Sequence, residues 1–172
     1  YDRRLSSTWL DALGAALPPL RYPCHALQMT AAYVAQMAPS GRVTLAALFQ
    51  SADEMRRIEG LARRMRQLQL VRPTLGADAR QVWQEDARWQ PLRRAVEELL
   101  VTYDLGEAFV ALNLCVKPIL DELTGVEWAA LAKTSGNQVG MVHMPAPQSG
   151  SETLLASSIA TARTRRTATS CF

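Results

Sequence analysis

Apolar residues recur every three or four positions along most of the chain, which is the spacing of one face of an α-helix. This pattern predicts a helix over residues 7–16, ended by Pro18 and Pro19, and a second helix from Pro23 to Met37. No segment shows the regular alternation of apolar and polar residues that is typical of a strand. The sequence therefore predicts an all-α protein.

A longer helix is predicted from about Arg42 to Leu70, and Pro73 and Gly76 are expected to stop it. Helical spacing predicts that one apolar stripe of this helix faces the protein core. The stripe consists of Leu45, Leu48, Phe49, Ala52, Met55, Ile58, Ala62 and Met65.

Capping signals predict where the next helices begin. Asp78 is placed to cap a segment that contains Trp83, and Pro91 fits the first turn of the helix that follows. Asp104 is expected to cap a further helix, with Glu107 at the third helical position, where an acid completes a capping box.

Two residues are expected to interrupt the end of the helical region. Pro118 predicts a kink or an early end of its helix. Gly125 predicts a break before a last short helix from Val126 to Lys133.

The composition of the chain changes after about residue 135. Residues 136–172 hold a single acid, Glu152, and are rich in Ser, Thr, Ala and Pro. We therefore divide the chain into a helical domain, residues 1–135, and an atypical tail, residues 136–172, which is expected to be poorly ordered.

The overall composition is that of a globular protein. With 48% hydrophobic residues, the chain is too apolar for a disordered protein. It has no run of about 18 uncharged apolar residues, so no membrane span is expected. Cys24 and Cys115 lie in apolar helical contexts and are expected to be buried, reduced thiols, which favours a cytoplasmic location. Because the chain begins with Tyr1 rather than Met, we interpret it as a fragment.

Arginine supplies most of the positive charge, and six arginines lie between Arg56 and Arg72. Such a stripe can mark a basic binding module for nucleic acid or another anionic surface. It can also be a helix face that meets water or an acidic partner subunit. Aromatic residues do not interleave with the arginines, which favours the second interpretation and argues against a nucleic-acid partner.

Two glutamates in helical stretches, Glu54 and Glu107, are both expected to face the inside of the bundle, which raises the question of a metal site. Di-iron helical bundles place Glu and Glu-x-x-His motifs on facing helices. Here Arg57 stands where the histidine after Glu54 would fall, and the two histidines, His25 and His143, lie in no such motif. A complete di-iron centre cannot be assembled from these residues, so we predict no metal ligand and no catalytic residue in this chain.

Arg57 has a physical reason to follow Glu54. A guanidinium on the same helix face can supply the positive charge that a buried carboxylate needs. One hypothesis is that Arg57 or Arg56 pairs with a core acid, either Glu54 or Glu107. The alternative is an ordinary surface pair between Asp53 and Arg57, four residues apart.

Four segments resemble a known family: residues 20–29 (LRYPCHALQM), 31–41 (AAYVAQMAPSG), 49–57 (FQSADEMRR) and 102–114 (TYDLGEAFVALNL). They closely resemble the β subunit of the hydroxylase component of bacterial multicomponent monooxygenases, with the toluene and phenol branch nearest. The resemblance covers about residues 1–135.

The resemblance implies a ferritin-like helical bundle and a non-catalytic structural subunit. It implies a hydroxylase of two α, two β and two γ subunits, which works with reductase and effector proteins. The α subunit would hold the di-iron centre, and this chain no cofactor. The complex would hydroxylate aromatic or small hydrocarbons with O₂ and electrons from NADH. Glu54, Arg57 and Glu107 would occupy vestigial ligand-equivalent positions.

The tail departs from the family, whose corresponding region continues as an amphipathic helix. A truncated or frame-shifted gene end would produce Ser-, Thr- and Arg-rich sequence of the kind found after about Gly136.

Overall fold

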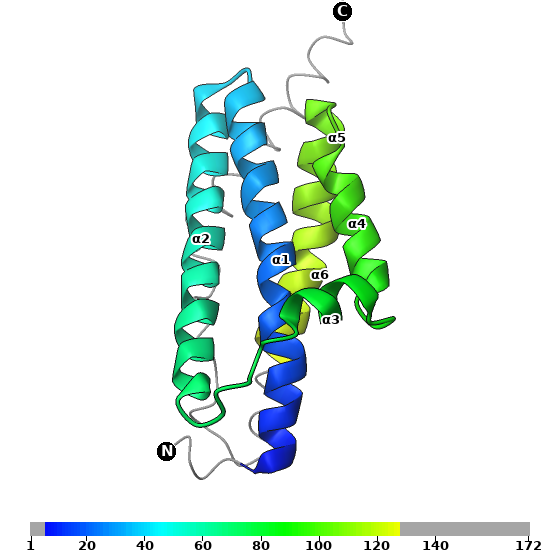
Figure 1. The fold of residues 1–172 in the computed structure, drawn as a ribbon. Helices are drawn as coiled ribbons and strands as arrows, with labels where there is room; N and C mark the ends of the chain where they lie inside the picture. Colours follow the sequence, from blue (N-terminus) through cyan, green and yellow to red (C-terminus); the bar gives the residue numbers. More distant parts are fainter. Residues whose placement is uncertain (1–5, 128–172) are drawn as a thin grey trace, which may run out of the picture.

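The computed structural model describes residues 6–127, and these form an all-α bundle with no strand among them, as predicted. α1 (Ser7–Met37) and α2 (Gly41–Gln69) form a long antiparallel hairpin. The later helices pack along α1, which is therefore the central element of the bundle (Figure 1).

α1 is one continuous helix, so the predicted end at Pro18 and Pro19 is wrong. A proline inside a helix removes one backbone hydrogen bond and costs about 3 kcal/mol. Here the apolar positions continue past the prolines at alternating intervals of three and four, and burying one leucine contributes about 1.5–3 kcal/mol. The buried face consists of Leu10, Leu13, Leu17, Leu20, Cys24, Leu27, Ala31 and Val34. Packing along this whole face outweighs the local preference for a break.

α2 has nearly the predicted bounds, but the predicted core stripe is wrong. Leu45, Leu48, Phe49 and Met55 are between 43% and 55% exposed, whereas Ile58 and Met65 are only partly buried. The face that packs against α1 is made of small, polar and charged residues with two leucines. These are Ala46, Ala47, Gln50, Ser51, Glu54, Arg57, Leu61 and Leu68.

The shorter helices follow the capping signals. They are α3 (Ala79–Glu85), α4 (Gln90–Leu100) and α5 (Leu105–Val110). Asp78 stands at the start of α3 without a side-chain cap bond, and Pro91 lies in the first turn of α4. The Asp104 carboxylate accepts a hydrogen bond from the Glu107 backbone N–H at 2.9 Å, as the capping signal predicts.

The helix that begins with α5 continues through Pro118 and Gly125, so the early end expected at Pro118 and the break expected at Gly125 are not found. Its later parts are η2 (Ala111–Val116), α6 (Lys117–Asp121) and η3 (Glu122–Glu127). η2 and η3 are π-helical, with wider turns than an α-helix. The wide turn of η2 directly precedes Pro118, whose missing N–H would leave a gap in a regular α-helical ladder.

None of the helices within residues 6–127 is both long enough and apolar enough to cross a bilayer. The predicted boundary near residue 135, the tail and most of the predicted helix from Val126 to Lys133 lie outside the described residues.

We expect Gly76 and Gly60 to respond in opposite ways to alanine. Gly76 has φ +82°, and an added Cβ would lie 2.9 Å from Met65 Cε and 3.2 Å from Pro18 Cγ. Gly76→Ala should therefore lower the free energy of unfolding by about 1–3 kcal/mol. Gly60 lies inside α2 with nothing within 4 Å of an added Cβ. Gly60→Ala should raise stability by about 0.5–1 kcal/mol. Urea unfolding followed by circular dichroism measures both, and equal stabilities would contradict the fold around Gly76.

Candidate functional site

The buried face of α2 carries a row of polar side chains, Gln50, Glu54 and Arg57. These residues are four and three positions apart, so helical geometry places them on one side of α2. Glu54 is fully buried and Arg57 is 5% exposed. The prediction that Glu54 looks inward is confirmed.

α6 supplies the partners of this row. Lys117 and Asp121 lie one helical turn apart, and both face Glu54 and Arg57 across the bundle. The Lys117 ammonium donates to Glu54 Oε1 at 3.1 Å and to Asp121 Oδ2 at 2.9 Å. Arg57 Nη2 donates to Asp121 Oδ1 at 2.5 Å. Arg57 Nη1 lies 3.4 Å from Glu54 Oε2, a charge contact without hydrogen-bond geometry.

These four side chains form a closed ring, which we call the ion cluster: Glu54, Arg57, Asp121 and Lys117. Acids and bases alternate around the ring, so two negative and two positive charges sum to zero. Burial alone would lower the pKa of Arg57 and of Lys117. The charges of Glu54 and Asp121 outweigh that effect, and the pKa of each base is raised. Both bases therefore stay charged inside the bundle.

Cys24 of α1 adjoins the ion cluster. Burial, and then the charge of Glu54, raise the pKa of this thiol to about 12, although the nearby Arg57 guanidinium acts in the opposite direction. Cys24 therefore remains a neutral, protonated thiol and is no nucleophile at neutral pH. Cys115, by contrast, is exposed, so the prediction that it is buried is wrong.

The other sequence candidates lie away from the cluster. Glu107 is exposed at the start of α5, where its backbone N–H takes part in the helix cap. The prediction that it faces inward is therefore wrong, and it is not the core acid that pairs with an arginine. Arg56 pairs with Asp53 at 2.9 Å near the surface. His25 is exposed on α1, and His143 lies outside the described residues. Of the alternatives, the core pair of Arg57 with Glu54 is confirmed.

Lys117 and Asp121 were not singled out from the sequence. The available signal is a base and an acid four residues apart in an otherwise largely apolar helical segment that runs from Ala108 to Asp121. On a surface helix this spacing is an ordinary pair. Only the ion pairs that Lys117 and Asp121 form with side chains of α2 turn it into half of a largely buried cluster.

The donor set at this position does not fit a pair of iron ions. Lys117 hydrogen-bonds both carboxylates, Arg57 hydrogen-bonds Asp121 and lies 3.4 Å from Glu54, and the histidine of α1 lies at the surface. A metal ion would have to displace both of these cations. No group of three or more His, Cys, Asp and Glu side chains within the described part of the chain is arranged to hold a metal ion.

What this arrangement does is structural. It joins α2 to α6 through charge-assisted hydrogen bonds, with the Cys24 thiol of α1 beside it. Removing one member of a buried charge pair leaves the other charge unpaired, which costs about 3–5 kcal/mol.

We therefore expect Arg57→Ala to lower the free energy of unfolding by about 3–5 kcal/mol, since it leaves Asp121 and Glu54 with one cation. The matched control is Arg56→Ala, which removes an exposed pair with Asp53 and should cost less than about 1 kcal/mol. Urea unfolding measures both. Arg57→Lys keeps the charge and should recover part of the loss. Equal losses for the two alanine variants would mean that charge pairing does not hold the cluster together.

We also expect alkaline pH to act through Cys24. An unperturbed cysteine thiol has a pKa of 9.0, and burial raises the pKa of Cys24 to about 12 in the folded chain, so the folded state keeps a proton that the unfolded state loses. This contribution to stability is complete below about pH 9 and is lost as the pH rises toward 12. Unfolding free energies measured from pH 8 to 11 should fall more steeply for the natural chain than for Cys24→Ala. Parallel profiles would contradict the burial of this thiol.

Comparison with known proteins bears out the resemblance. A family model described as methane/phenol/alkene hydroxylase matches residues 1–152. The chain is 40% identical over 124 residues to the β subunit of the hydroxylase component of the toluene-4-monooxygenase system from Ectopseudomonas mendocina. That alignment covers 71% of this chain and 38% of the relative, so the chain spans well under half the length of that protein.

The fold is also similar to a solved structure. A chain of toluene 4-monooxygenase, in a structure with toluene bound in the resting active site, superposes with a TM-score of 0.82 at 33% identity. The match covers 89% of this chain and 52% of the other. The expected ferritin-like helical fold is thereby confirmed. The chain belongs to the methane/phenol/alkene hydroxylase family.

Proposed function

We propose that this chain is a non-catalytic structural subunit of a multicomponent monooxygenase hydroxylase. The α subunit of that hydroxylase holds the di-iron centre, and a γ subunit completes the assembly. The complex hydroxylates aromatic or small hydrocarbons with O₂ and with electrons that pass from NADH through a reductase. Family membership and similarity to a hydroxylase β subunit support this proposal.

The ion cluster is the observation that carries the non-catalytic role. The buried carboxylate of Glu54 and the partly buried carboxylate of Asp121 are each bound by Lys117, and both face Arg57. We propose that Glu54 and Arg57 are the vestige of a Glu-x-x-His motif. In this vestige, Arg57 supplies the positive charge that a metal ion would otherwise supply to the buried carboxylate. Glu107 takes no part in this arrangement because it lies at the surface.

The exposed apolar side chains of α2 support the structural role. Leu45, Leu48, Phe49 and Met55 lie on one exposed side of a long helix. Clustered exposed apolar residues of this size commonly mark a protein interface. A subunit that works only within an assembly would keep such a face for its partner.

Co-expression tests the proposal. We expect the full chain to co-purify with the α and γ subunits of its hydroxylase, and the iron in the complex to equal that bound by α. The rate of NADH-dependent toluene hydroxylation should be at least about tenfold lower in preparations without this chain, because α would lack its scaffold. The measurements are light-scattering mass, iron per subunit and turnover with the reductase present.

Two outcomes would contradict the proposal. One is an α–γ complex with full activity in the absence of this chain. The other is the isolated chain purifying with two equivalents of iron.

A further inference from the structure

An apolar stripe on α2 lies on the face opposite the ion cluster. We define it as Leu45, Leu48, Phe49, Ala52 and Met55, all exposed and spaced by one, three or four residues. The four large side chains are each close to half exposed. Fully burying a side chain of this kind contributes about 1.5–3 kcal/mol. A partner that covers the stripe would therefore gain a favourable free energy of binding.

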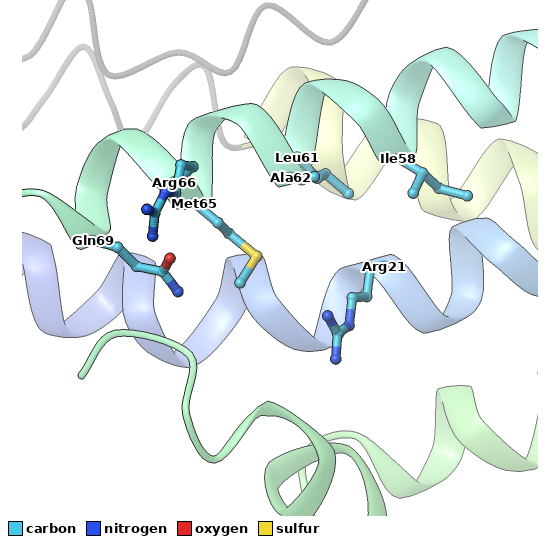
Figure 2. A pocket seen from close by; sticks show the side chains of 7 residues that line it. All are labelled: Arg21, Ile58, Leu61, Ala62, Met65, Arg66 and Gln69. Carbon is cyan, nitrogen blue, oxygen red and sulfur yellow. The ribbon is translucent and has the colours of Figure 1, made fainter. Parts of the chain in front are cut away.

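The stripe leads into a groove beside α1. Continuing from Met55 at helical spacing, the same side of α2 reaches Ala62, which lines a hollow of about 320 Å³ with Ile58 and Met65. Arg21 of α1 and Arg66 of α2 stand at its polar edge, and Figure 2 shows these side chains reaching from the two neighbouring helices. The groove is therefore apolar in its floor and cationic at its rim.

The C-terminal half of α2 carries unpaired positive charge. Arg57 is inside the ion cluster and Arg72 pairs with Asp11, so these two arginines are not available. Arg63 and Arg66 are exposed and have no acidic partner among the described residues. The exposed acid of this stretch is Glu59. The outer surface of α2 is thus apolar over its first half and cationic over its second.

We propose that this surface of α2 binds an amphipathic helix of the α subunit of the hydroxylase, apolar along one half and acidic along the other. The apolar half packs on the stripe, one apolar side chain enters the groove, and carboxylates reach Arg63, Arg66 and Arg21. From Leu45 to Arg66 the surface is about 32 Å long at 1.5 Å per residue, which corresponds to about six helical turns of the partner. The proposal rests on the structural-subunit function above.

Charge and apolarity together select this occupant. Nucleic acid is disfavoured because its interfaces are polar and phosphate-dominated, which leaves the leucines and Phe49 uncovered. The arginine-bearing half of α2 in a second copy of this chain holds one acid, Glu59, which is too few to neutralise the arginines of both copies. An acidic amphipathic helix satisfies both halves of the surface.

The test measures binding of the full chain to the purified α subunit of its hydroxylase. Leu48→Glu and the double variant Arg63→Glu/Arg66→Glu should each raise the dissociation constant at least about tenfold. The affinity of the natural chain should fall as salt increases, and the double variant should lose this dependence. Matched controls are Leu114→Glu and Arg80→Glu, which change exposed residues on other helices. Both controls should bind as the natural chain does.

The outcomes separate the two proposals. If the natural chain does not bind α, the proposed function fails and this inference fails with it. If the natural chain binds and both α2 variants bind equally well, the function stands and this surface is not the contact. Equal weakening by the Leu114 and Arg80 controls would also overturn the assignment to α2. The assignment would also be overturned if the chain bound a 20-nucleotide DNA tightly and Arg63→Glu/Arg66→Glu abolished that binding without changing the affinity for α. Circular dichroism of each variant shows that the fold is retained.

Discussion

The buried carboxylate of Glu54 sets the conditions that the rest of the bundle meets. A charged carboxylate away from water needs a counter-charge and hydrogen-bond donors, or its burial costs several kcal/mol. Lys117 and Arg57 provide both, and Asp121 balances the second cation. Since these partners come from α6 and α2, the cluster fixes how the two helices face each other. It also fixes the rotation of α2, because Glu54 and Arg57 point inward together.

The rotation of α2 explains its outer surface. A helix that turns its polar row toward the core must turn its apolar stripe away from it. The alternative rotation would bury Leu48 and Phe49 but would expose Glu54 and leave Lys117 and Asp121 facing a hydrocarbon surface. Small residues such as Ala46, Ala47 and Ser51 on the inner face let α1 and α2 approach closely without large side chains between them. The apolar stripe is thus a consequence of the ion cluster, and it becomes useful when a partner covers it.

Local signals in the sequence predicted the elements better than their packing. The extent of α2, the cap at Asp104 and the position of Pro91 depend on neighbouring residues alone, and all three were predicted correctly. The inward face of α2 was not, because helical periodicity identifies an apolar stripe without distinguishing a core from an interface. Pro18 failed as a stop signal for a related reason: the burial of α1 against several helices is a tertiary effect. Lys117 could not be recognised without knowing that the side chains of α6 reach those of α2.

The ion cluster keeps four charged side chains at a position where apolar residues could give equal stability. Well-packed apolar residues often match or exceed the stability of a buried ion cluster. Charged groups penalise a wrong arrangement more strongly, since a shift of α2 by one residue would break the two ion pairs that cross from α2 to α6, Arg57–Asp121 and Lys117–Glu54. Apolar residues tolerate such a shift because dispersion and burial are not directional. A subunit whose task is to hold one helix surface in a defined orientation toward a partner needs this specificity more than additional stability, and the ion cluster provides it directly beneath that surface.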